Sequence, residues 1–392
     1  MIRNILGVSI LCLVAILAAC SDNAVSENNP EVLKVDIEVS KTSEFLKEIK
    51  RIKFIPLETK ADVLIGSIQK IKIFNDRVYI LDIFSAKSVF IYDFNGKHVK
   101  TICSVGKGPA EYVRLWDIAI DPFNKELITV DVGSKKIHKY DLNGVFKEEQ
   151  KLGFTPYSIG IADKNTYAFK TVNQRDPVIV TTNHLGQKIK EVHSGVFEFN
   201  MNLFCHFPRS NDGRQLYLEY LNDTIYEIGK DYSEPWLIID FQNLAITPKK
   251  QEELKKWSNM RRTMPSVPKN YAGAVGPLLE SESFINFYCE HDEGMSSVLW
   301  DKHTQKHICI HKLRRGDDMM TRLLFYLLTV KDADSFVGKI SSYEMSELFD
   351  NKYFKSLQEQ GKIEFEESGF ANQREVTLES NPVLFTIEYN RL

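Results

Sequence analysis

The sequence predicts an all-β protein, a single six-bladed β-propeller with two short helical insertions. Two observations support this fold class. Short runs of β-branched and aromatic residues, separated by turn residues, fill the chain from about residue 32 to Phe241. Within them Asn95-Gly96 returns 48 positions later as Asn143-Gly144, and a weaker copy, Asn183-His184-Leu185-Gly186, follows 42 positions after that. A period of about 40 to 50 residues with several strands per unit is typical of propeller blades.

Residues 1–19 are predicted to be a lipoprotein signal peptide. Arg3 supplies the positive charge of such a signal, and the apolar run from Ile5 to Leu17 is shorter than the roughly 20 residues of a membrane-spanning helix. The following Leu17-Ala18-Ala19-Cys20 resembles the bacterial lipobox, in which the peptidase cuts before the cysteine and the thiol carries the lipid. We therefore expect lipidation at Cys20. The alternative is an ordinary secretory signal in which Cys20 is incidental.

Residues 20–31 are predicted to form a flexible tether. The stretch from Ser21 to Pro30 has hardly any apolar residue, so it cannot bury enough surface to order itself. Each buried acyl methylene contributes about 0.8 kcal/mol, so an acylated Cys20 makes the membrane a partner without a spanning helix. We expect an exported protein that is lipid-anchored in the bacterial cell envelope at the outer membrane. Both the periplasmic and the outer face of that membrane remain alternatives for its position.

Composition and charge exclude some classes of partner. The formal net charge is -3, and removal of Arg3 with the signal peptide makes the mature chain slightly more negative, so no nucleic-acid partner is expected. Hydrophobic residues make up 43% of the chain, which is enough for a large core, and residues 32–392 are assigned to the propeller.

The four later cysteines are scattered, and we assume no disulfide framework. They are Cys103, Cys205, Cys289 and Cys309.

The first repeat contains the elements of a propeller blade. Val78 to Ile83 and Val89 to Asp93 are predicted strands, and Asn95-Gly96 supplies the turn before an outer strand, Val99 to Ile102. One such sheet cannot bury both of its faces alone, whereas blades stacked in a closed ring can. The later blades are assigned to Tyr157–His193, Leu203–Phe241, Phe284–His311 and Leu323–Ser342, with Val383–Tyr389 pairing near the N-terminal strands to close the ring.

Two helical insertions interrupt the strands. Thr247-Pro248 is a helix start signal, and the segment rich in lysine and glutamate that follows predicts a helix over about residues 247–262. The second helix is predicted over about residues 341–360, with Ser341 or Ser342 as its N-cap. Both are expected to cover an edge or one face of the ring, because neither is long enough for a separate helical domain.

The chain also resembles a known group of propellers. Tyr92 to Lys97, followed by the loop Gly106 to Tyr112, is similar to the repeat-and-loop signature of NHL-like six-bladed β-propellers, with Ala110 in place of a common glycine. Asn222 to Ile228 and the terminal Asn381-Pro382-Val383-Leu384 resemble the six-bladed propeller lipoproteins of the Bacteroidota, as does Trp236 to Phe241. The biochemical role of these lipoproteins is largely unassigned, so the resemblance implies a fold and no chemistry.

The loops that cross from one blade to the next suggest a ligand site. The crossing loop Gly106 to Tyr112 is expected to place aromatic and arginine side chains at the rim of the central channel, where stacking and forked hydrogen bonds suit a sugar or peptide. The alternative is that Trp116 and Tyr157 only pack between blades. The candidate ligand-binding residues are Tyr112, Arg114, Trp116, Tyr157, His206 and Arg209.

A second cluster has the residue types of a metal site. His307, Cys309 and His311 would share one face of a strand, and nitrogen and sulfur ligands suit zinc. His303 lies in a preceding turn. The alternative, which we favour, is a half-buried face of an outer strand. No cofactor is expected, and a calcium or zinc ion in the channel is the open alternative.

The sequence favours a binding or scaffold module over an enzyme. The expected partner of the channel face is a glycan, a peptide or an envelope protein. The alternative function is a propeller-type hydrolase or lyase, with or without a metal ion, that acts on an extracellular polymer or lactone. The chain has neither a Gly-x-Ser-x-Gly elbow nor a His-Glu-x-x-His motif, so no catalytic residue can be selected. A structural subunit of an outer-membrane complex is a third alternative.

Overall fold

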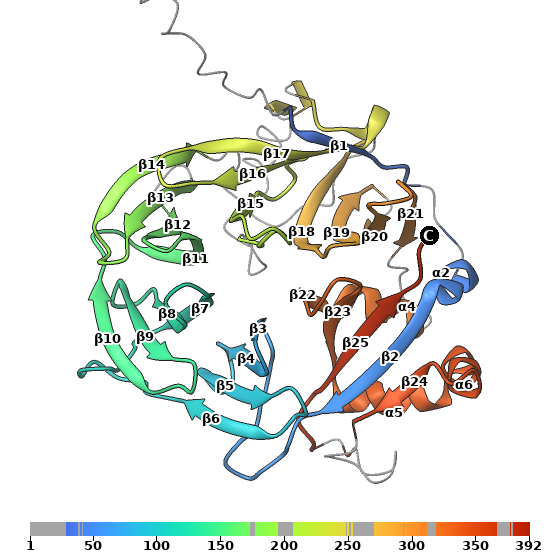
Figure 1. Ribbon diagram of the computed structural model, residues 1–392, viewed down its shortest axis with the longest axis horizontal. Helices are drawn as coiled ribbons and strands as arrows, with labels where there is room; N and C mark the ends of the chain where they lie inside the picture. Colours follow the sequence, from blue (N-terminus) through green and yellow to red (C-terminus); the bar gives the residue numbers. More distant parts are fainter. Residues whose placement is uncertain are drawn as a thin grey trace, which may run out of the picture.

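The computed structural model is a ring of six small sheets, which confirms the predicted six-bladed propeller (Figure 1). Residues described are 29–37, 40, 42–172, 177–194, 207–247, 249–250, 252–253, 270–292, 294–311, 319–366, 377 and 379–392. Residues 1–28, which hold the predicted signal peptide, Cys20 and most of the tether, lie outside them.

Blades 1 to 3 each have four antiparallel strands that follow one another in the chain. Blade 1 consists of β3 (Lys70–Phe74), β4 (Arg77–Asp82), β5 (Ser88–Asp93) and β6 (His98–Ile102). Blade 2 consists of β7 (Leu115–Asp121), β8 (Glu126–Asp131), β9 (Lys136–Asp141) and β10 (Phe146–Lys151). Blade 3 consists of β11 (Pro156–Asp163), β12 (Thr166–Val172), β13 (Pro177–Asn183) and β14 (Lys188–Ser194).

Blades 4 and 6 combine segments that are far apart in the chain, whereas blade 5 has four consecutive antiparallel strands. Blade 4 consists of β15 (Leu216–Leu218), β16 (Thr224–Ile228), β17 (Ser233–Asp240) and, at its outer edge, β1 (Glu31–Lys34). Blade 5 consists of β18 (Ala272–Glu280), β19 (Phe284–His291), β20 (Gly294–Asp301) and β21 (His307–His311). Blade 6 has the order β22 (Leu327–Val330), β23 (Ser335–Ile340), β25 (Val383–Tyr389), β2 (Ile49–Pro56) and β24 (Ile363–Phe365).

The repeated turn motif is a local hydrogen-bonding device. Asp93 Oδ1 accepts the backbone N–H groups of Asn95 and Lys97 at 3.0 and 2.9 Å, and Asp141 repeats the arrangement with residues 143 and 145. Gly96 has φ +84°, a conformation that glycine adopts without strain. The 48-residue repeat in the sequence therefore marks the hairpin between the third and fourth strands of blades 1 and 2.

The N-terminal segment joins three blades on the outer side of the ring, at the sheet edge in blades 4 and 5 and next to the edge strand β24 in blade 6. β1 runs parallel to β17, with Glu31 opposite Leu237. The Ser40 N–H then donates to the Cys309 carbonyl of β21 at 2.8 Å, and β2 pairs antiparallel with β25. The predicted closure of the ring by Val383–Tyr389 is thus confirmed, and the core lies between neighbouring blades because a closed ring covers both faces of every sheet.

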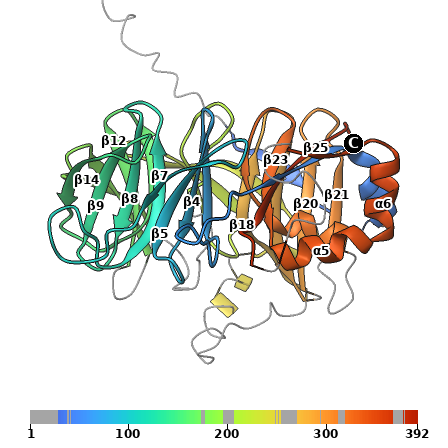
Figure 2. The same cartoon turned by 90° about the horizontal axis from the view of Figure 1, so that it is seen from below.

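Some boundaries differ from the prediction. Blade 5 begins at Ala272, before the expected Phe284, and β1 begins at Glu31, the last residue assigned to the tether. The segment 341–360 forms two helices, α5 (Ser342–Asp350) and α6 (Lys352–Glu359), because Asn351 has a non-helical backbone and caps α6. Ser341 caps α5 through a capping box. Figure 2 shows both helices at the outer side of the ring.

The other helical segments are short. Two helices that were not predicted are α2 (Thr42–Glu48) and α4 (Met319–Arg322), and single turns form at η1 (Gln242–Leu244) and η2 (Leu323–Tyr326). Of the helix expected over about 247–262, residues 247, 249–250 and 252–253 lie within the described residues; residue 247 is not helical, and the other four are. Within the described residues, no helix has the length and apolar character that crossing a bilayer requires.

Candidate functional site

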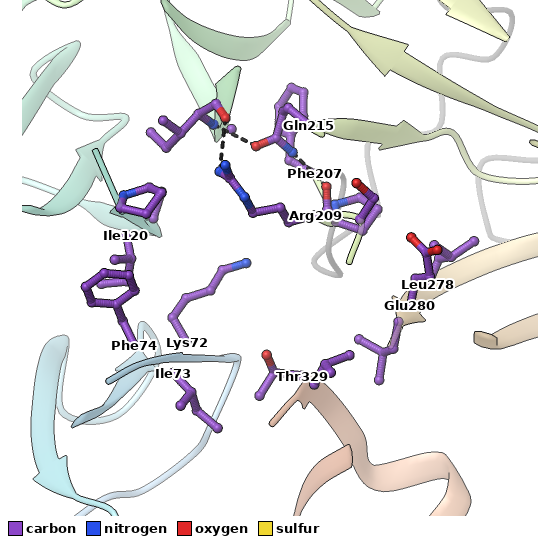
Figure 3. A pocket seen from close by; sticks show the side chains of 18 of the residues that line it. Lys72, Ile73, Phe74, Ile120, Phe207, Arg209, Gln215, Leu278, Glu280 and Thr329 are labelled. Carbon is purple, nitrogen blue, oxygen red and sulfur yellow. Dashed lines mark hydrogen bonds between the residues drawn. The ribbon is translucent and has the colours of Figure 1, made fainter. Parts of the chain in front are cut away.

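A cavity of about 340 Å³ occupies part of the central channel (Figure 3). The innermost segment of every blade contributes to its wall. One contributor from each blade, in order, is Lys72, Ile120, Ile161, Arg209, Leu278 and Thr329. The convergence of six blades on one concave space is the feature that a ligand site requires.

The cavity lies at the end of the channel opposite the crossing loops. β7 begins at Leu115, directly after its crossing loop, but its cavity-lining residues are Ala119 and Ile120 near the strand's end. The same holds in blade 5, where β18 begins at Ala272 and lines the cavity with Leu278 to Glu280. The cavity therefore opens toward the turns that join the first and second strands of each blade.

Arg209 lines this cavity and has two contacts with neighbouring blades. Its Nη1 donates to the Ile161 carbonyl at 3.3 Å, and its Cζ lies 5.4 Å from the centre of the Phe123 ring. Burial lowers the pKa of Arg209, and the nearby Asp121 carboxylate opposes that effect. An arginine remains protonated despite such a shift, so a guanidinium cation faces the cavity.

The buried Gln215 fixes the segment that carries Arg209. Its Oε1 accepts the Ile161 N–H at 2.7 Å, and its Nε2 donates to the carbonyls of Pro208 and Leu216 at 2.7 and 3.1 Å. A Cβ at Gly160 would lie 2.6 Å from the Gln215 side chain, so the two blades approach too closely for any larger residue there. This contact couples blade 4 to blade 3 beside the cavity.

Lys72 is the second cation of the cavity. It extends from β3, and Figure 3 shows its ammonium group pointing into the same space as the Arg209 guanidinium. Glu280 is the one acidic residue among the described residues that line the cavity. Its carboxylate accepts a hydrogen bond from Lys302 Nζ at 2.6 Å and another from the Asn211 N–H at 3.1 Å. The cavity therefore combines apolar walls with two cations and one carboxylate that is already paired.

Asp117 crosslinks three inner strands next to the cavity. It forms a buried ion pair with Lys70, and its Oδ2 accepts hydrogen bonds from Ser158 Oγ at 2.6 Å and the Ile159 N–H at 3.0 Å. Removing one partner of such a pair leaves the other charge buried without a counter-charge, which destabilises the folded protein. These charges thus hold blades 1 to 3 together.

The structure brings three of the predicted ligand residues together at the crossing end of the channel. Arg114 Cζ lies 5.5 Å from the centre of the Trp116 ring, and the Trp116 and Tyr157 rings meet edge to face at 5.9 Å. Trp116 and Tyr157 are half-buried, and Arg114 is exposed. Arg209 instead lines the cavity at the other end. The predicted set is therefore divided between two ends of the channel.

The other predicted residues have different positions. Tyr112 is fully buried, and its hydroxyl donates to the Lys87 carbonyl at 2.6 Å, so its expected place at the channel rim is wrong. The reason is that the crossing loop folds back, with the Tyr112 N–H bound to the Ser104 carbonyl at 2.9 Å. His206 lies outside the described residues. Sequence reasoning missed Lys72, which sits two residues after Lys70 on the same strand.

The His307, Cys309 and His311 cluster takes part in packing, the alternative that the sequence favours. The His307 ring stacks on Trp300 with centroids 5.3 Å apart, Cys309 is buried, and His311 Nδ1 lies 3.2 Å from Ser296 Oγ. Burial raises the pKa of the Cys309 thiol to about 11, which disfavours the thiolate that binds zinc. In the described part of the chain, no three His, Cys, Asp or Glu side chains converge to hold a metal ion.

Comparison with known proteins places the chain in a family. Residues 31–388 match the family described as "Domain of unknown function (DUF4934)". The chain belongs to the DUF4934 family. The match covers every blade, from β1 to nearly the end of β25, so the family is defined by the whole propeller. No curated protein matches this DUF4934 sequence.

Two solved structures share the architecture of this DUF4934 protein. A protein of Bacteroides fragilis NCTC 9343, named as an exported protein, is 17% identical with a TM-score of 0.70, covering 92% of this chain and 99% of that one. A member of the DUF4221 family from Bacteroides vulgatus ATCC 8482 is 8% identical with a TM-score of 0.50, covering 88% and 98%. At these identities the likeness shows the fold alone.

Proposed function

We propose that this DUF4934 protein is a lipid-anchored binding module of the bacterial cell envelope that holds a ligand in its central cavity. The observation that carries the proposal is the convergence of six blades on one cavity whose apolar walls surround two cations. Mostly apolar concave sites with a few well-placed polar groups are the usual form of small-molecule sites. Its volume of about 340 Å³ suits a small molecule or the end of a larger one.

The groups at the cavity favour binding over catalysis. General acid–base chemistry needs two titratable groups whose environments separate their pKa values. Among the described lining residues the titratable side chains are Lys72, Arg209 and Glu280, and Glu280 is paired with Lys302. Arg209 cannot exchange protons near neutral pH. The lining residues are thus better suited to retain a charged ligand than to transfer protons.

The expected location in the cell envelope favours a ligand that is found at the outer membrane. The Bacteroides fragilis protein of the same fold is named as an exported protein. An N-terminal signal followed by Cys20 would bring this chain to the envelope and hold it at the outer membrane. The ligands available there include fragments of glycans and peptides, which agrees with a cavity that has both apolar walls and charged groups.

A ligand screen tests this function and its position. The mature chain with Cys20→Ala, which keeps it water-soluble, is screened by thermal shift and calorimetry against glycan fragments and short peptides. Thr329→Trp fills the cavity, and Trp116→Ala removes the aromatic group at the crossing end. Binding that is lost in Thr329→Trp and kept in Trp116→Ala supports the cavity. The reverse pattern would place the ligand at the crossing end, and conversion of a ligand to products would favour the hydrolase or lyase alternative.

A further inference from the structure

We infer that the outer edge of blade 4, formed by β1 and β17, is the surface of the propeller that faces the lipid membrane. This inference rests on the lipid anchor of the proposed function and adds the orientation of the ring. Blade 1 then points away from the bilayer, and both ends of the central channel are open to the surrounding solution.

The strand β1 fixes the point at which the anchored chain joins the ring. It pairs with β17, where Glu31 lies opposite Leu237. Leu33 and Val35 are buried in the hydrophobic cluster between blades 4 and 5, and the Val35 N–H donates to the Asp240 carbonyl at 2.9 Å. Glu31 is therefore held at the outer side of the ring, where Figure 1 shows β1.

The length of the anchored chain limits which side of the ring can reach the membrane. Eleven residue steps separate Cys20 from Glu31, and at about 3.3–3.6 Å per residue they span no more than about 40 Å. A domain of about 360 residues is roughly 50 Å across. Blades 4 and 1 lie on opposite sides of the ring (Figure 1), so the path around it from β1 to β6 is longer than this chain. With β1 in place, the bilayer is within reach of blade 4 and out of reach of blade 1.

The residues at this edge suit a lipid–water interface. Val32 is 47% exposed at the second position of β1, opposite Ile238. On β17 the exposed Pro235 precedes Trp236, which is half-buried. Tryptophan is enriched where proteins meet lipid headgroups, because its ring is apolar and its N–H is polar. A single exposed valine is common on protein surfaces. This one adjoins the anchored chain and shares its edge with a tryptophan.

This orientation leaves the cavity accessible to a ligand. The channel runs through the centre of the ring, so a ring that turns one outer edge to the bilayer has its channel axis along the membrane surface (Figures 1 and 2). The cavity opens toward the turns between the first and second strands, and the crossing loops lie at the other end. Since neither end faces the lipid, a ligand reaches the cavity from solution.

Quenching of a fluorescent label by lipid headgroups tests this orientation. The acylated full-length protein, with Cys103 and Cys205 replaced by alanine, is bound to phosphatidylcholine vesicles in which some headgroups carry a nitroxide quencher. The remaining propeller cysteines are buried and stay unlabelled. Each variant receives one labelled cysteine at an exposed position: Val32→Cys at the blade 4 edge, Lys100→Cys on β6 of blade 1, Lys164→Cys in the turn between β11 and β12 at the cavity end, or Val113→Cys at the crossing end.

We expect the label at residue 32 to lose most of its fluorescence, the labels at residues 113 and 164 to lose less, and the label at residue 100 to lose almost none. Each loss is measured against the same label on the unanchored Cys20→Ala protein. Equal quenching of all four labels would mean that the ring has no fixed orientation, and strongest quenching at any position other than residue 32 would mean that another surface faces the lipid. Either result would overturn the inference.

Failure of this inference and failure of the proposed function have different signatures. In both results that overturn the orientation, the protein stays bound to the vesicles, so the lipid-anchored module is unaffected. A full-length protein that does not float with the vesicles would contradict the anchor, and the orientation with it. Failure of the ligand screen, with strongest quenching at residue 32, would contradict ligand binding and support the orientation.

Discussion

The side-chain oxygen of Gln215 accepts the backbone N–H of Ile161 at 2.7 Å, and this contact joins two blades at the cavity wall. This contact also determines where Arg209 lies. Arg209 and Gln215 pair in an isolated antiparallel β-bridge, and both side chains contact Ile161. The position of the Arg209 guanidinium group thus depends on the buried side-chain amide of Gln215.

Replacing this amide should weaken both the fold and the site. Gln215→Ala leaves the buried Ile161 N–H without its acceptor, which costs about 1–3 kcal/mol of unfolding free energy. Urea unfolding measures that loss, and calorimetry should show weaker ligand binding by the folded variant. Gln358→Ala, at an exposed position of α6, is the matched control and should unfold like the wild type. Wild-type stability of Gln215→Ala would show that this contact contributes nothing.

The turn glycines provide a test of the repeat. Gly96→Ala should destabilise the protein by about 1–3 kcal/mol, because residue 96 has φ +84° and an added Cβ would overlap the Pro56 carbonyl oxygen. Gly153→Ala is the control, since an added Cβ there meets no atom within 4 Å. Thermal unfolding of the two variants measures the difference. If the two variants have the same melting temperature, the close approach of the β5–β6 hairpin to β2 is not needed for stability.

Asp223 should make stability depend on pH. Burial raises the pKa of Asp223 to about 7 in the folded protein, from an ordinary value of 3.8. Because the folded pKa is the higher one, the unfolding free energy should fall as pH rises from about 4 to about 7, where the folded state must give up that proton. Asp223→Asn has a neutral side chain of similar shape at every pH. The stability of this variant relative to the wild type should therefore be higher at pH 8 than at pH 5. Urea midpoints of both proteins at the two pH values measure this, and a pH-independent difference would contradict it.

The anchor is tested in cells. Cys20→Ala should abolish metabolic labelling with a fatty-acid probe and release the mature chain from the membrane fraction, because its only predicted acylation site is gone. Cys103→Ala, which removes an exposed cysteine of the propeller, should remain labelled and membrane-bound. Labelling of the Cys20→Ala protein would show that the lipid is attached elsewhere.

The features that sequence could predict are those with local causes. The Asp93 turn repeats at Asp141 because each carboxylate binds N–H groups two and four residues away, and a local pattern is visible as a repeat. β18 was missed because Ala272 to Glu280 reads Ala-Gly-Ala-Val-Gly-Pro-Leu-Leu-Glu, with few of the β-branched residues typical of strands. The strand forms because it is buried between β19 and the channel.

The cavity could not be predicted in the same way. Lys72 and Arg209 are far apart in the chain and line one cavity only because the ring closes, so no spacing in the sequence relates them. Arg209 is a candidate on sequence grounds, but no sequence pattern indicates which end of the channel it occupies. The Arg114, Trp116 and Tyr157 group was predictable because all three directly follow crossings between blades.

A crystal structure of the mature protein grown with its tightest-binding glycan fragment or peptide gives the most direct test of binding in the cavity. We expect density for the ligand in the cavity, within contact distance of Arg209 and Thr329. Density for the ligand against Trp116 and Tyr157, with the cavity unchanged, would contradict this proposal and move the binding site to the other end of the channel.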